Sequence, residues 1–516
     1  MLRQGLRTGL VGLALVLGFG FASCGDSEGD SKLTPDDKNP PVEEIRPIEE
    51  RALEQWNFLD EAGRVLILRG VNLAGAAKGP TGLPGTVENT ESDAEQIKDL
   101  GFNVVRYLIQ WKNIEPAPNE YDYEYLADVR ERLDLLHAQG IKVVLDMHQD
   151  VYGPKFGFNG GADWTVRDDG IPYSQNPNWF LNYMTPAVQR AFDNFFNYEE
   201  HGDLQDHFAA MWRETAKELG DHPAVIAFDI MNEPHPGTDW DLLEFGSDNS
   251  KSSHARFDRE KLGPFYQRVI NAIREANADK WILYESRYGV PGDGGKCYVE
   301  KLTDPREGNS RLFQAPHLYI LNTEASRVYG ANAEKRVAKW ETERVSERDK
   351  NVTGMWLGEF GTFTSVENYQ KYMEDILAVT ERMRIGFAAW SWDVFEFGMI
   401  GERDPETGRH EEGPFLDIIS RPYPRAFAGT PLSFMFTPET EVLEATWKVD
   451  HSIEAPTEFF MAQQRWYENG YDVSVTPEAG VTIESSEDGQ IVWITVDEAS
   501  IEEVSVTFSP SELVLP

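Results

Sequence analysis

The chain contains 516 residues, of which 41% are hydrophobic, and its formal net charge at pH 7 is −40. This length exceeds one ordinary domain and fits a large barrel followed by a smaller module. The negative charge makes nucleic acid and anionic membrane surfaces poor partners for the folded body. Cys24 and Cys297 are the only cysteines, so the chain has no cysteine pattern for binding a metal.

The first 23 residues predict an export signal. Arg3 and Arg7 form a basic start, and the apolar run 10–21 is too short to span a membrane as a stable helix. Small residues directly precede Cys24, a pattern that resembles the cleavage site of bacterial lipoproteins, in which the cysteine then carries lipid. The alternative is an ordinary secretory signal with an incidental cysteine. Either signal exports the protein, and the absence of aspartate after Cys24 favours the outer membrane.

The segment after this signal is polar. Residues 24–47 are rich in Asp, Glu, Ser and Pro, which predicts a flexible acidic tether that holds the body off the membrane. Residues 56–64 then predict a hairpin with a glycine-containing turn. If lipid occupies Cys24, Cys297 has no disulfide partner, and we expect it to be a buried free thiol.

From residue 65 onwards, apolar strands alternate with amphipathic helices. Helical spacing is clear over 123–139 and 365–383, whereas the connection between the fifth and sixth strands holds little more than a turn near 298–302. Eight β/α units predict an α/β fold of the (β/α)8 TIM-barrel class over residues 48–430, with the site at the carboxyl ends of the strands. The predicted strands are 65–73, 103–109, 142–147, 225–231, 281–285, 312–318, 355–360 and 386–392.

Two other segments depart from the β/α alternation. Residues 149–186, after the third strand, form a long connection rich in aromatic residues, and a long loop on the catalytic face is more often functional than idle. Beyond Thr430 the chain changes to short alternating segments separated by turns, without a helix signal. This pattern predicts a C-terminal β-sandwich over residues 431–516.

Glu233 is the first candidate catalytic residue. The apolar strand 227–231 runs directly into Asn232, Glu233 and Pro234. Desolvation at such a strand end favours the protonated carboxyl, which suits a general acid, and the neighbouring amide can hold a substrate hydroxyl. The alternative is a surface acid at a capped strand end.

The other strand ends supply a second carboxylate and several polar groups. Glu359 follows the seventh strand, and two carboxylates flanking one bond are the requirement of glycoside hydrolysis. Arg106 and Tyr319 are placed to keep Glu359 ionised as the nucleophile. His148, after the third strand, is a further candidate for the site; the alternative is a buried histidine whose hydrogen bonds only support the core. The remaining strand-end candidates are Asp150, Asn232, His317 and Trp390, with Trp392 as the alternative to Trp390 for stacking on a sugar. No metal or cofactor is required.

These motifs resemble the retaining enzymes of glycoside hydrolase family 5, and more narrowly the endoglycoceramidases. Asn-Glu-Pro at 232–234 and Gly-Glu-Phe-Gly at 358–361 carry the family resemblance. The narrower one depends on Asp-Met-His-Gln-Asp-Val-Tyr at 146–152, Ala-Asp-Trp-Thr-Val-Arg at 162–167, and Arg-Pro-Tyr-Pro-Arg-Ala at 421–426, followed by Ala-Gly-Thr-Pro at 428–431. The resemblance covers about residues 50–516.

The resemblance implies roles for these residues. Glu233 would be the acid/base and Glu359 the nucleophile, with net retention of configuration. The residues implied to contact the sugar are Lys78, His148, Asp150, Trp179, Asn232, Tyr319 and Trp390, of which Lys78 and Trp179 match only by loop position. The implied substrate is an oligosaccharide β-linked to ceramide. Candidates for the wall of an acyl-chain groove are Tyr152, Phe156, Phe158 and Phe395.

Two rival functions are compatible with the sequence. One is a family 5 glucosidase or endoglucanase acting on other β-glucosides or soluble β-glucans; clustering of the aromatic residues in one loop favours a pocket over an open cleft. The other is a non-catalytic, glycan-binding surface lipoprotein, against which the presence of both glutamates argues, since binding alone needs no nucleophile. The preferred head group, the oligomeric state and the role of the sandwich stay open.

Overall fold

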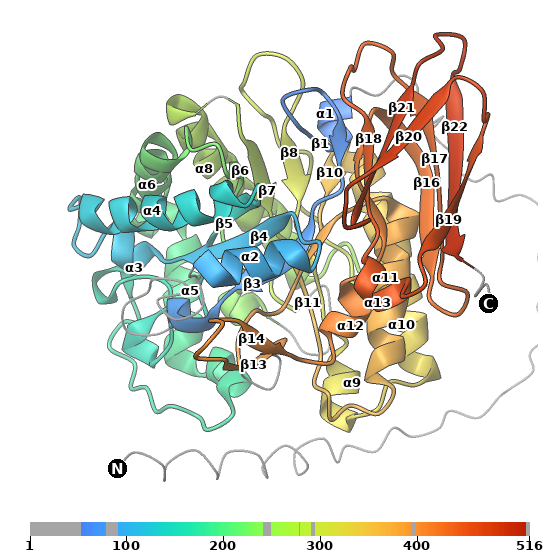
Figure 1. The fold of residues 1–516 in the computed structure, drawn as a ribbon. Helices are drawn as coiled ribbons and strands as arrows, with labels where there is room; N and C mark the ends of the chain where they lie inside the picture. The colour runs from blue at the N-terminus through green and yellow to red at the C-terminus, as the bar shows by residue number, and fades with distance from the viewer. Residues whose placement is uncertain are drawn as a thin grey trace, which may run out of the picture.

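Eight parallel strands surround the core of the first domain (Figure 1). The computed structural model describes residues 53–78, 91–240, 249–277, 279–289, 295–394 and 398–511. The strands are ordered β10-β8-β7-β6-β5-β4-β3-β12. Their bounds are β3 Arg69–Leu73, β4 Val104–Ile109, β5 Lys142–Met147, β6 Val225–Asp229, β7 Trp281–Tyr284, β8 Leu312–Gln314, β10 Gly354–Met355 and β12 Phe387–Ala389.

The sheet closes between the seventh and eighth strands. Leu357 forms a parallel bridge with Phe387, and Leu357 N–H donates to the carbonyl oxygen of Gly386 at 3.1 Å. Beyond this point, β9 (His317–Leu318) and β11 (Glu359–Phe360) form a short parallel pair that continues the sixth and seventh strands. The predicted barrel is therefore confirmed, and its carboxyl end carries the candidate residues.

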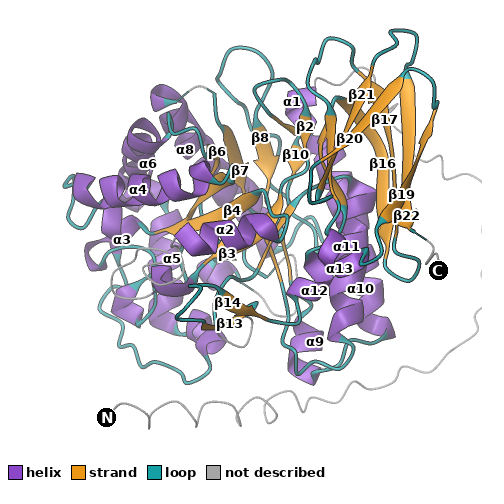
Figure 2. Cartoon of the chain, viewed as in Figure 1, coloured by secondary structure: helices purple, strands orange, loops and turns teal. Residues whose placement is uncertain are grey.

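Helices cover the outside of these strands (Figure 2). In α4 (Tyr123–Ala138) the apolar residues at helical spacing are buried, as predicted, and Asp122 caps the amino end by accepting from Tyr125 N–H at 2.9 Å. The helix predicted over 365–383 begins only at Tyr369, because Asn368 has φ 64° and interrupts the helical backbone. The other long helices are α2 Glu91–Asp99, α5 Pro186–Phe196, α6 Tyr198–Leu219, α8 Gly263–Ala276, α10 Ala331–Asn351 and α11 Tyr369–Met383.

Shorter elements fill the connections. In the described part of 285–311 the chain forms no helix, as expected for the connection between the fifth and sixth strands, and Cys297 there is a buried free thiol. The long loop after β5 contains three short 3-10 turns, Pro154–Phe156, Asp163–Thr165 and Trp179–Met184. The short helices are α1 Leu53–Trp56, α3 Trp111–Ile114, α7 Ser253–Phe257, α9 Leu321–Ser326 and α12 Leu416–Ile419; β13 Ile400–Arg403 and β14 His410–Glu412 form a hairpin.

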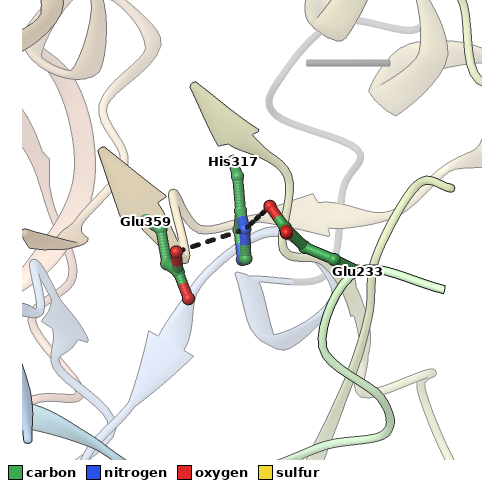
Figure 3. A group of neighbouring side chains, drawn as sticks. All are labelled: Glu233, His317 and Glu359. Carbon is green, nitrogen blue, oxygen red and sulfur yellow. Dashed lines mark hydrogen bonds and ion pairs between the residues drawn. The ribbon is translucent and has the colours of Figure 1, made fainter. Parts of the chain in front are cut away.

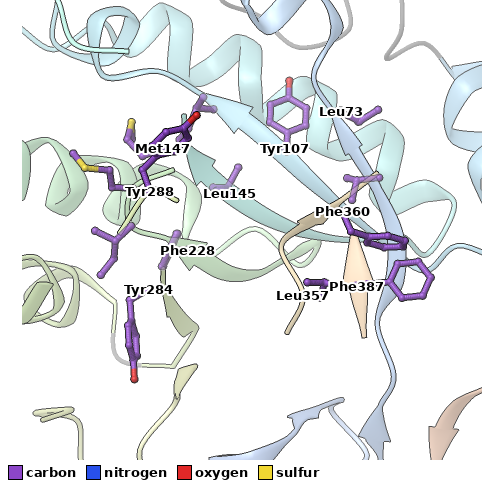
Figure 4. Packing of buried hydrophobic residues seen from close by; sticks show 14 of the residues in the cluster. Leu73, Tyr107, Leu145, Met147, Phe228, Tyr284, Tyr288, Leu357, Phe360 and Phe387 are labelled. Atoms are coloured by element: carbon purple, nitrogen blue, oxygen red, sulfur yellow. The ribbon is translucent and has the colours of Figure 1, made fainter. Parts of the chain in front are cut away.

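Alternating apolar side chains build the barrel core (Figure 4). Every residue of β3, β4, β6 and β7 is buried, as expected for parallel strands covered on both faces. Leu145, Phe228 and Phe387 are among the side chains that pack between strands and helices. This packing leaves the polar residues at the strand ends in fixed positions.

The second domain is the predicted β-sandwich of two antiparallel sheets. One sheet has the order β1-β2-β15-β18-β21-β20 and the other β16-β17-β22-β19. The strands are β1 Phe58–Leu59, β2 Val65–Leu66, β15 Tyr423–Phe427, β16 Gly429–Thr437, β17 Val442–Val449, β18 Thr457–Phe460, β19 Tyr471–Thr476, β20 Val481–Ser485, β21 Ile491–Val496 and β22 Glu503–Pro510.

The sandwich includes more of the chain than residues 431–516. The hairpin β1-β2, far away in sequence, pairs with β15, so the sandwich begins before the predicted boundary. The expectation that no helix follows Thr430 is wrong, because α13 (Gln463–Trp466) interrupts the strands. Local alternation could not reveal that a hairpin at the start of the barrel completes a sheet at the end of the chain.

A buried ion network connects the two domains. Glu381 on α11 accepts from Arg69 Nη2 at 2.9 Å and lies 3.3 Å from Nε of Arg421. Its second oxygen accepts the backbone N–H of Phe436 on β16 at 3.1 Å. These three charged side chains are each 1% exposed. The Arg-Pro-Tyr-Pro segment predicted as the junction is therefore part of the contact between barrel and sandwich.

Several predicted features lie outside the described residues. These are the signal, Cys24, the tether over 24–47 and Phe395. Among the helices of the described ranges, none has the length and apolar character needed to cross a membrane.

Candidate active site

Glu359 lies at the end of the seventh strand, in register with His317 on β9. Its Oε1 accepts a hydrogen bond from Arg106 Nη1 at 2.7 Å, and its Oε2 accepts one from the Tyr319 hydroxyl at 3.0 Å. Burial and the charges of Glu359 and Glu233 raise the pKa of Tyr319 well above its usual value, so the phenol stays a donor. Arg106 and Tyr319 therefore both contact the carboxylate of Glu359, at the positions that the sequence predicted for them.

Glu233 lies across from Glu359, four residues after the end of β6 at Asp229 (Figure 3). His317 Nδ1 is 3.0 Å from Glu233 Oε1 and 3.6 Å from Glu359 Oε2. One oxygen of each glutamate and a nitrogen of His317 lie within 4.8 Å of one another. The two carboxylates are thus close enough to act on a single bond.

The backbone of Glu233 adopts an unusual conformation, with φ 43°. This left-handed region disfavours residues with a Cβ, so surrounding contacts must hold it. Gln149 Nε2 donates to the carbonyl oxygens of Asn232 and Glu233 at 2.9 and 3.0 Å. Glu285 Oε2 accepts the Glu233 N–H at 2.8 Å. Hydrogen bonds with Gln149 and Glu285 therefore hold the backbone of Glu233 on both sides of its Cα.

Arg106 is fully buried at the centre of the site. Its guanidinium forms ion pairs at 2.9 Å with Asp146, Asp229 and Glu285 and at 2.7 Å with Glu359. Burial alone would lower the pKa of Arg106, but these carboxylates raise it well above the usual value. Arg106 also donates to the side-chain oxygens of Asn72 and Asn232, each at 3.1 Å.

The surroundings of His317 favour its positively charged form. Burial would lower its pKa, but the charges of Glu285 and Glu359 and the hydrogen bond to Glu233 outweigh burial and raise the pKa well above its usual value. His317 is 1% exposed, and its other nitrogen, Nε2, lies 3.3 Å from Glu285 Oε1. The histidine predicted from its position thus connects the acid to a further carboxylate.

A second polar group, formed by the side chains of Lys78, Asp146, His148 and Asp150, lies beside the glutamates. His148 Nδ1 is 2.7 Å from Asp146 Oδ2, and its Nε2 is 3.4 Å from Asp150 Oδ2. Lys78 Nζ is 2.8 Å from the same Asp150 oxygen and 4.3 Å from the centre of the Trp390 ring. Burial would raise the pKa of Asp150, but the charges of Lys78 and His148 lower it.

Trp390 and Trp392 differ in their surroundings. Trp390 is half-buried and stacks on His148 with ring centres 5.7 Å apart and planes at 15°. Trp392 is fully buried, and its Nε1 donates to Asp93 at 3.5 Å. Only Trp390 presents an accessible aromatic face beside the polar group, in agreement with the preference for Trp390 over Trp392.

Trp179 and the predicted groove residues fare differently. Trp179 is 50% exposed and packs edge-on against Phe180 and Tyr183. Phe156 is fully buried and Tyr152 is 5% exposed, and both belong to the barrel core. The prediction that these two line an acyl-chain groove is therefore wrong, because aromatic residues of a long loop can pack inward as well as outward.

Five residues at the site were not among the predicted contacts. They hold Arg106, His148 and the backbone beside Glu233, and they are Asn72, Asp146, Gln149, Asp229 and Glu285. Four of them end or follow barrel strands or flank His148, which is a usable signal. Asn72 lies within β3 and has no local sequence feature that distinguishes it.

Asp146, Asp229 and Glu285 are close enough together to hold a cation. All three form ion pairs with Arg106 instead. The guanidinium therefore supplies the positive charge that these carboxylates need.

Family comparisons agree with this geometry. Residues 59–396 match the cellulase family, glycosyl hydrolase family 5, and residues 421–507 match the glycoside hydrolase family 5 C-terminal domain. The chain belongs to glycoside hydrolase family 5. The predicted enzyme class is thereby confirmed, and a catalytic family with both glutamates in place argues against a protein that only binds glycans.

Individual relatives narrow the likeness. An endoglycoceramidase of Cyanea nozakii is 24% identical over 461 residues, covering 83% of this chain and 87% of the relative. Endo-glycoceramidase II from Rhodococcus sp., solved as a lactosyl-enzyme intermediate, is 32% identical with a TM-score of 0.76, covering 88% of this chain and 100% of the other. Its complex with ganglioside GM3 matches at 31% identity and a TM-score of 0.77, covering 88% and 99%. These matches confirm the predicted resemblance to endoglycoceramidases.

Proposed function

We propose that this family 5 enzyme is a retaining endo-β-glycosidase that hydrolyses the bond between the glycan and the ceramide of glycosphingolipids. The observation that carries the mechanism is the approach of the Glu233 and Glu359 carboxylates to within 4.8 Å. Retaining glycosidases place their carboxyl groups about 5 Å apart, whereas inverting enzymes need about 6.5–9.5 Å to accommodate a water molecule. The arrangement therefore favours direct attack by one carboxylate.

In the first step, Glu359 attacks the anomeric carbon while Glu233 donates its proton to the leaving oxygen. Before the attack, Arg106 and Tyr319 donate hydrogen bonds to the carboxylate of Glu359. These hydrogen bonds weaken as the ester forms. In the second step, Glu233 takes a proton from water, which then attacks the glycosyl-enzyme, and Glu359 is regenerated. The bond formed to Glu359 in the first step is broken in the second, and because each displacement inverts the anomeric carbon, the two steps together retain its configuration.

The polar group beside the glutamates is suited to hold the sugar. Asp150 can accept hydrogen bonds from sugar hydroxyls, and Lys78 and His148 can donate to them. Trp390 offers a ring for the C–H face of the sugar. Asn232, which accepts from Arg106 and donates to the Gln149 carbonyl oxygen at 3.1 Å, is oriented by both partners. We assign Trp179 to the rim of the site, where its exposed ring can contact an incoming glycan or lipid.

The substrate assignment is supported by the solved relatives. Endo-glycoceramidase II from Rhodococcus sp. carries ganglioside GM3 in one structure and a lactosyl group in another. The same two-domain layout supports a substrate of the same class. Enzymes acting on simpler glucosides are rivals, and a substrate panel separates them.

Incubation with a ganglioside, lactosylceramide, galactosylceramide and a cello-oligosaccharide, followed by mass analysis of the products, tests the proposal. Release of the intact glycan together with ceramide is expected. Release of monosaccharide alone, or action on the cello-oligosaccharide alone, would contradict it. Glu359→Gln protein, checked for folding, serves as the matched control and is expected to release nothing.

We also propose that the protein is exported and anchored to the cell envelope through lipid on Cys24. The basic start, the short apolar run and the small residues before Cys24 support this. An anchor of this kind would hold the barrel at a membrane surface. Mass spectrometry of the amino-terminal peptide and a Cys24→Ser variant, expected to move to the soluble fraction, test it.

A further inference from the structure

Glu285 follows β7 and is 2% exposed. Its Oε2 accepts the backbone N–H of Glu233 at 2.8 Å. Its Oε1 accepts a hydrogen bond from Arg106 Nη2 at 2.9 Å and lies 3.3 Å from His317 Nε2. Glu285 is thus linked to Glu233 in two ways. It accepts the backbone N–H of Glu233 directly, and it lies beside His317, which contacts the side chain of Glu233.

The backbone contact has a conformational reason. Glu233 has φ 43°, a region that a residue with a side chain adopts only when its surroundings hold it there. Glu285 holds the N–H and Gln149 holds the carbonyl oxygen of the same residue. Loss of the Glu285 contact would leave the Glu233 N–H without its acceptor and would weaken the hold on this backbone conformation.

The contact through His317 has an electrostatic reason. The two ring nitrogens face two carboxylates, Glu233 on one side and Glu285 on the other. Burial raises the pKa of Glu285 while His317 and Arg106 oppose that shift, and the pKa of His317 is itself raised. These contacts favour a proton on the Glu285–His317 pair. Because Arg106 and the Glu233 N–H both donate to Glu285, that proton is better placed on His317.

Other titratable groups surround this pair and contribute to any pH profile. Arg106, Asp229, Glu233 and Glu359 act on the pair directly. Asp146, Tyr319 and Glu324 act on those four groups.

We propose that Glu285 is a positioning residue for the acid/base: it fixes the backbone of Glu233 and keeps His317 charged, so that His317 stabilises the carboxylate that Glu233 becomes when it gives up its proton. This inference rests on the proposed role of Glu233. It predicts that Glu285 matters most for substrates whose leaving group needs a proton. A residue that only supports the fold would affect all substrates alike.

Glu285→Gln is the discriminating variant, because the amide oxygen can still accept the Glu233 N–H but the charge is gone. We expect kcat/KM for lactosylceramide to fall about 10–100-fold, within the range that general acid catalysis supplies. For an aryl lactoside with an acidic phenol as leaving group, the fall is expected to be less than about threefold, since that group departs without protonation. Equal losses on both substrates would overturn the proposal.

Two further variants separate the possible failures. Glu233→Gln is expected to show the same selective loss, larger in size; if it loses both substrates equally, the acid/base assignment itself fails. If Glu233→Gln is selective and Glu285→Gln is not, only the role of Glu285 fails. Glu381→Gln, a buried charge removed from the network between the domains, is the matched control and should leave the ratio between substrates unchanged.

The protonation of His317 gives an independent readout. Carbon-13 NMR of labelled histidine, with His317 among ten histidines identified by its loss in His317→Asn, reports its pKa. In the wild type we expect the ring to titrate well above its ordinary value, and in Glu285→Gln its pKa should fall. A wild-type His317 that titrates near its ordinary value of about 6.5 would overturn the proposal even if the variant does not fold.

Discussion

Two buried arginines of this protein serve opposite ends of the barrel. Arg106, at the mouth, forms ion pairs with four carboxylates, and these raise its pKa. Arg69, near the sandwich, shares Glu381 with Arg421, and burial lowers its pKa. Aromatic rings complete its surroundings, including Tyr423 at 4.7 Å. In this protein, the arginine with more carboxylate partners lies where charge changes during the reaction. The arginine that shares a single carboxylate lies at a structural contact.

Removal of Glu359 at the carboxylate-rich end should have the largest effect on activity. Glu359→Gln is expected to reduce kcat by on the order of 10⁴-fold or more, because a neutral amide cannot form the glycosyl-enzyme. The thermal midpoint should be unchanged or raised, since a buried charge is removed. Turnover of lactosylceramide and thermal unfolding measure the two effects. Residual activity within about tenfold of the wild type would refute the nucleophile assignment.

The two arginines themselves make the most direct comparison. Arg106→Met leaves four carboxylates without their shared cation, so we expect loss of activity together with a stability decrease of about 3–5 kcal/mol. Arg69→Met leaves Glu381 with Arg421 and should cost less stability while kcat stays within about twofold. Urea unfolding and kcat of both proteins measure the difference. An Arg69 variant that is folded yet inactive would show that the two networks are not separate.

The two tryptophans sharpen the comparison between accessible and buried groups. Trp390→Ala should lower kcat/KM about 10–100-fold by removing the ring beside Lys78 and His148, with a small change in stability. Trp392→Ala should instead cost about 3–5 kcal/mol of stability, because it leaves a cavity in the core. Kinetics and thermal unfolding of both variants test this. A kinetic defect confined to Trp392→Ala would reverse the assignment of the stacking residue.

A smaller effect is expected from pH. The pKa of His317 is raised in the folded protein, so its contribution to stability is complete below its unfolded pKa of about 6.5 and declines as pH rises through the folded value. The thermal midpoint should therefore decrease from about pH 6 to about pH 9, and Glu285→Gln should show a smaller decrease. Calorimetry across this range is the measurement. A midpoint that rises toward pH 9 would contradict the raised pKa.

Much of the fold could be predicted because it depends on local patterns. The helix over 123–139 was predicted to within one residue of α4, since its apolar spacing and closing glycine are local. The start of α11 was missed because Asn368 breaks the helix through its backbone conformation, which composition does not reveal. The pairing of β2 with β15 was missed because it joins segments far apart in the sequence.

The site shows the same division. Glu233, Glu359, His317 and Tyr319 were predicted because each lies near the carboxyl end of a barrel strand, and parallel strands bring these ends to one rim. Arg106 was predicted at the end of the second strand but lies within β4 (Val104–Ile109) and reaches the site through its long side chain. Of the groups that contact Arg106, Glu359 and Asn232 were predicted, whereas Asp146, Asp229 and Glu285 were not, because which strand-end carboxylates meet one arginine depends on how distant strands pack. The choice between an inward and an outward ring, as for Phe156 and Trp390, depends on packing that no local pattern contains.

The sequence by itself determined the barrel, the sandwich and the two glutamates, because strand and helix periodicities and strand-end motifs are written in neighbouring residues. The tertiary structure alone decided that Glu233 rests on Glu285, that His317 lies between them, and that an amino-terminal hairpin completes the sandwich. These contacts depend on how distant segments pack in a low-dielectric interior, where a hydrogen bond or a charge acts over a few ångströms irrespective of sequence separation.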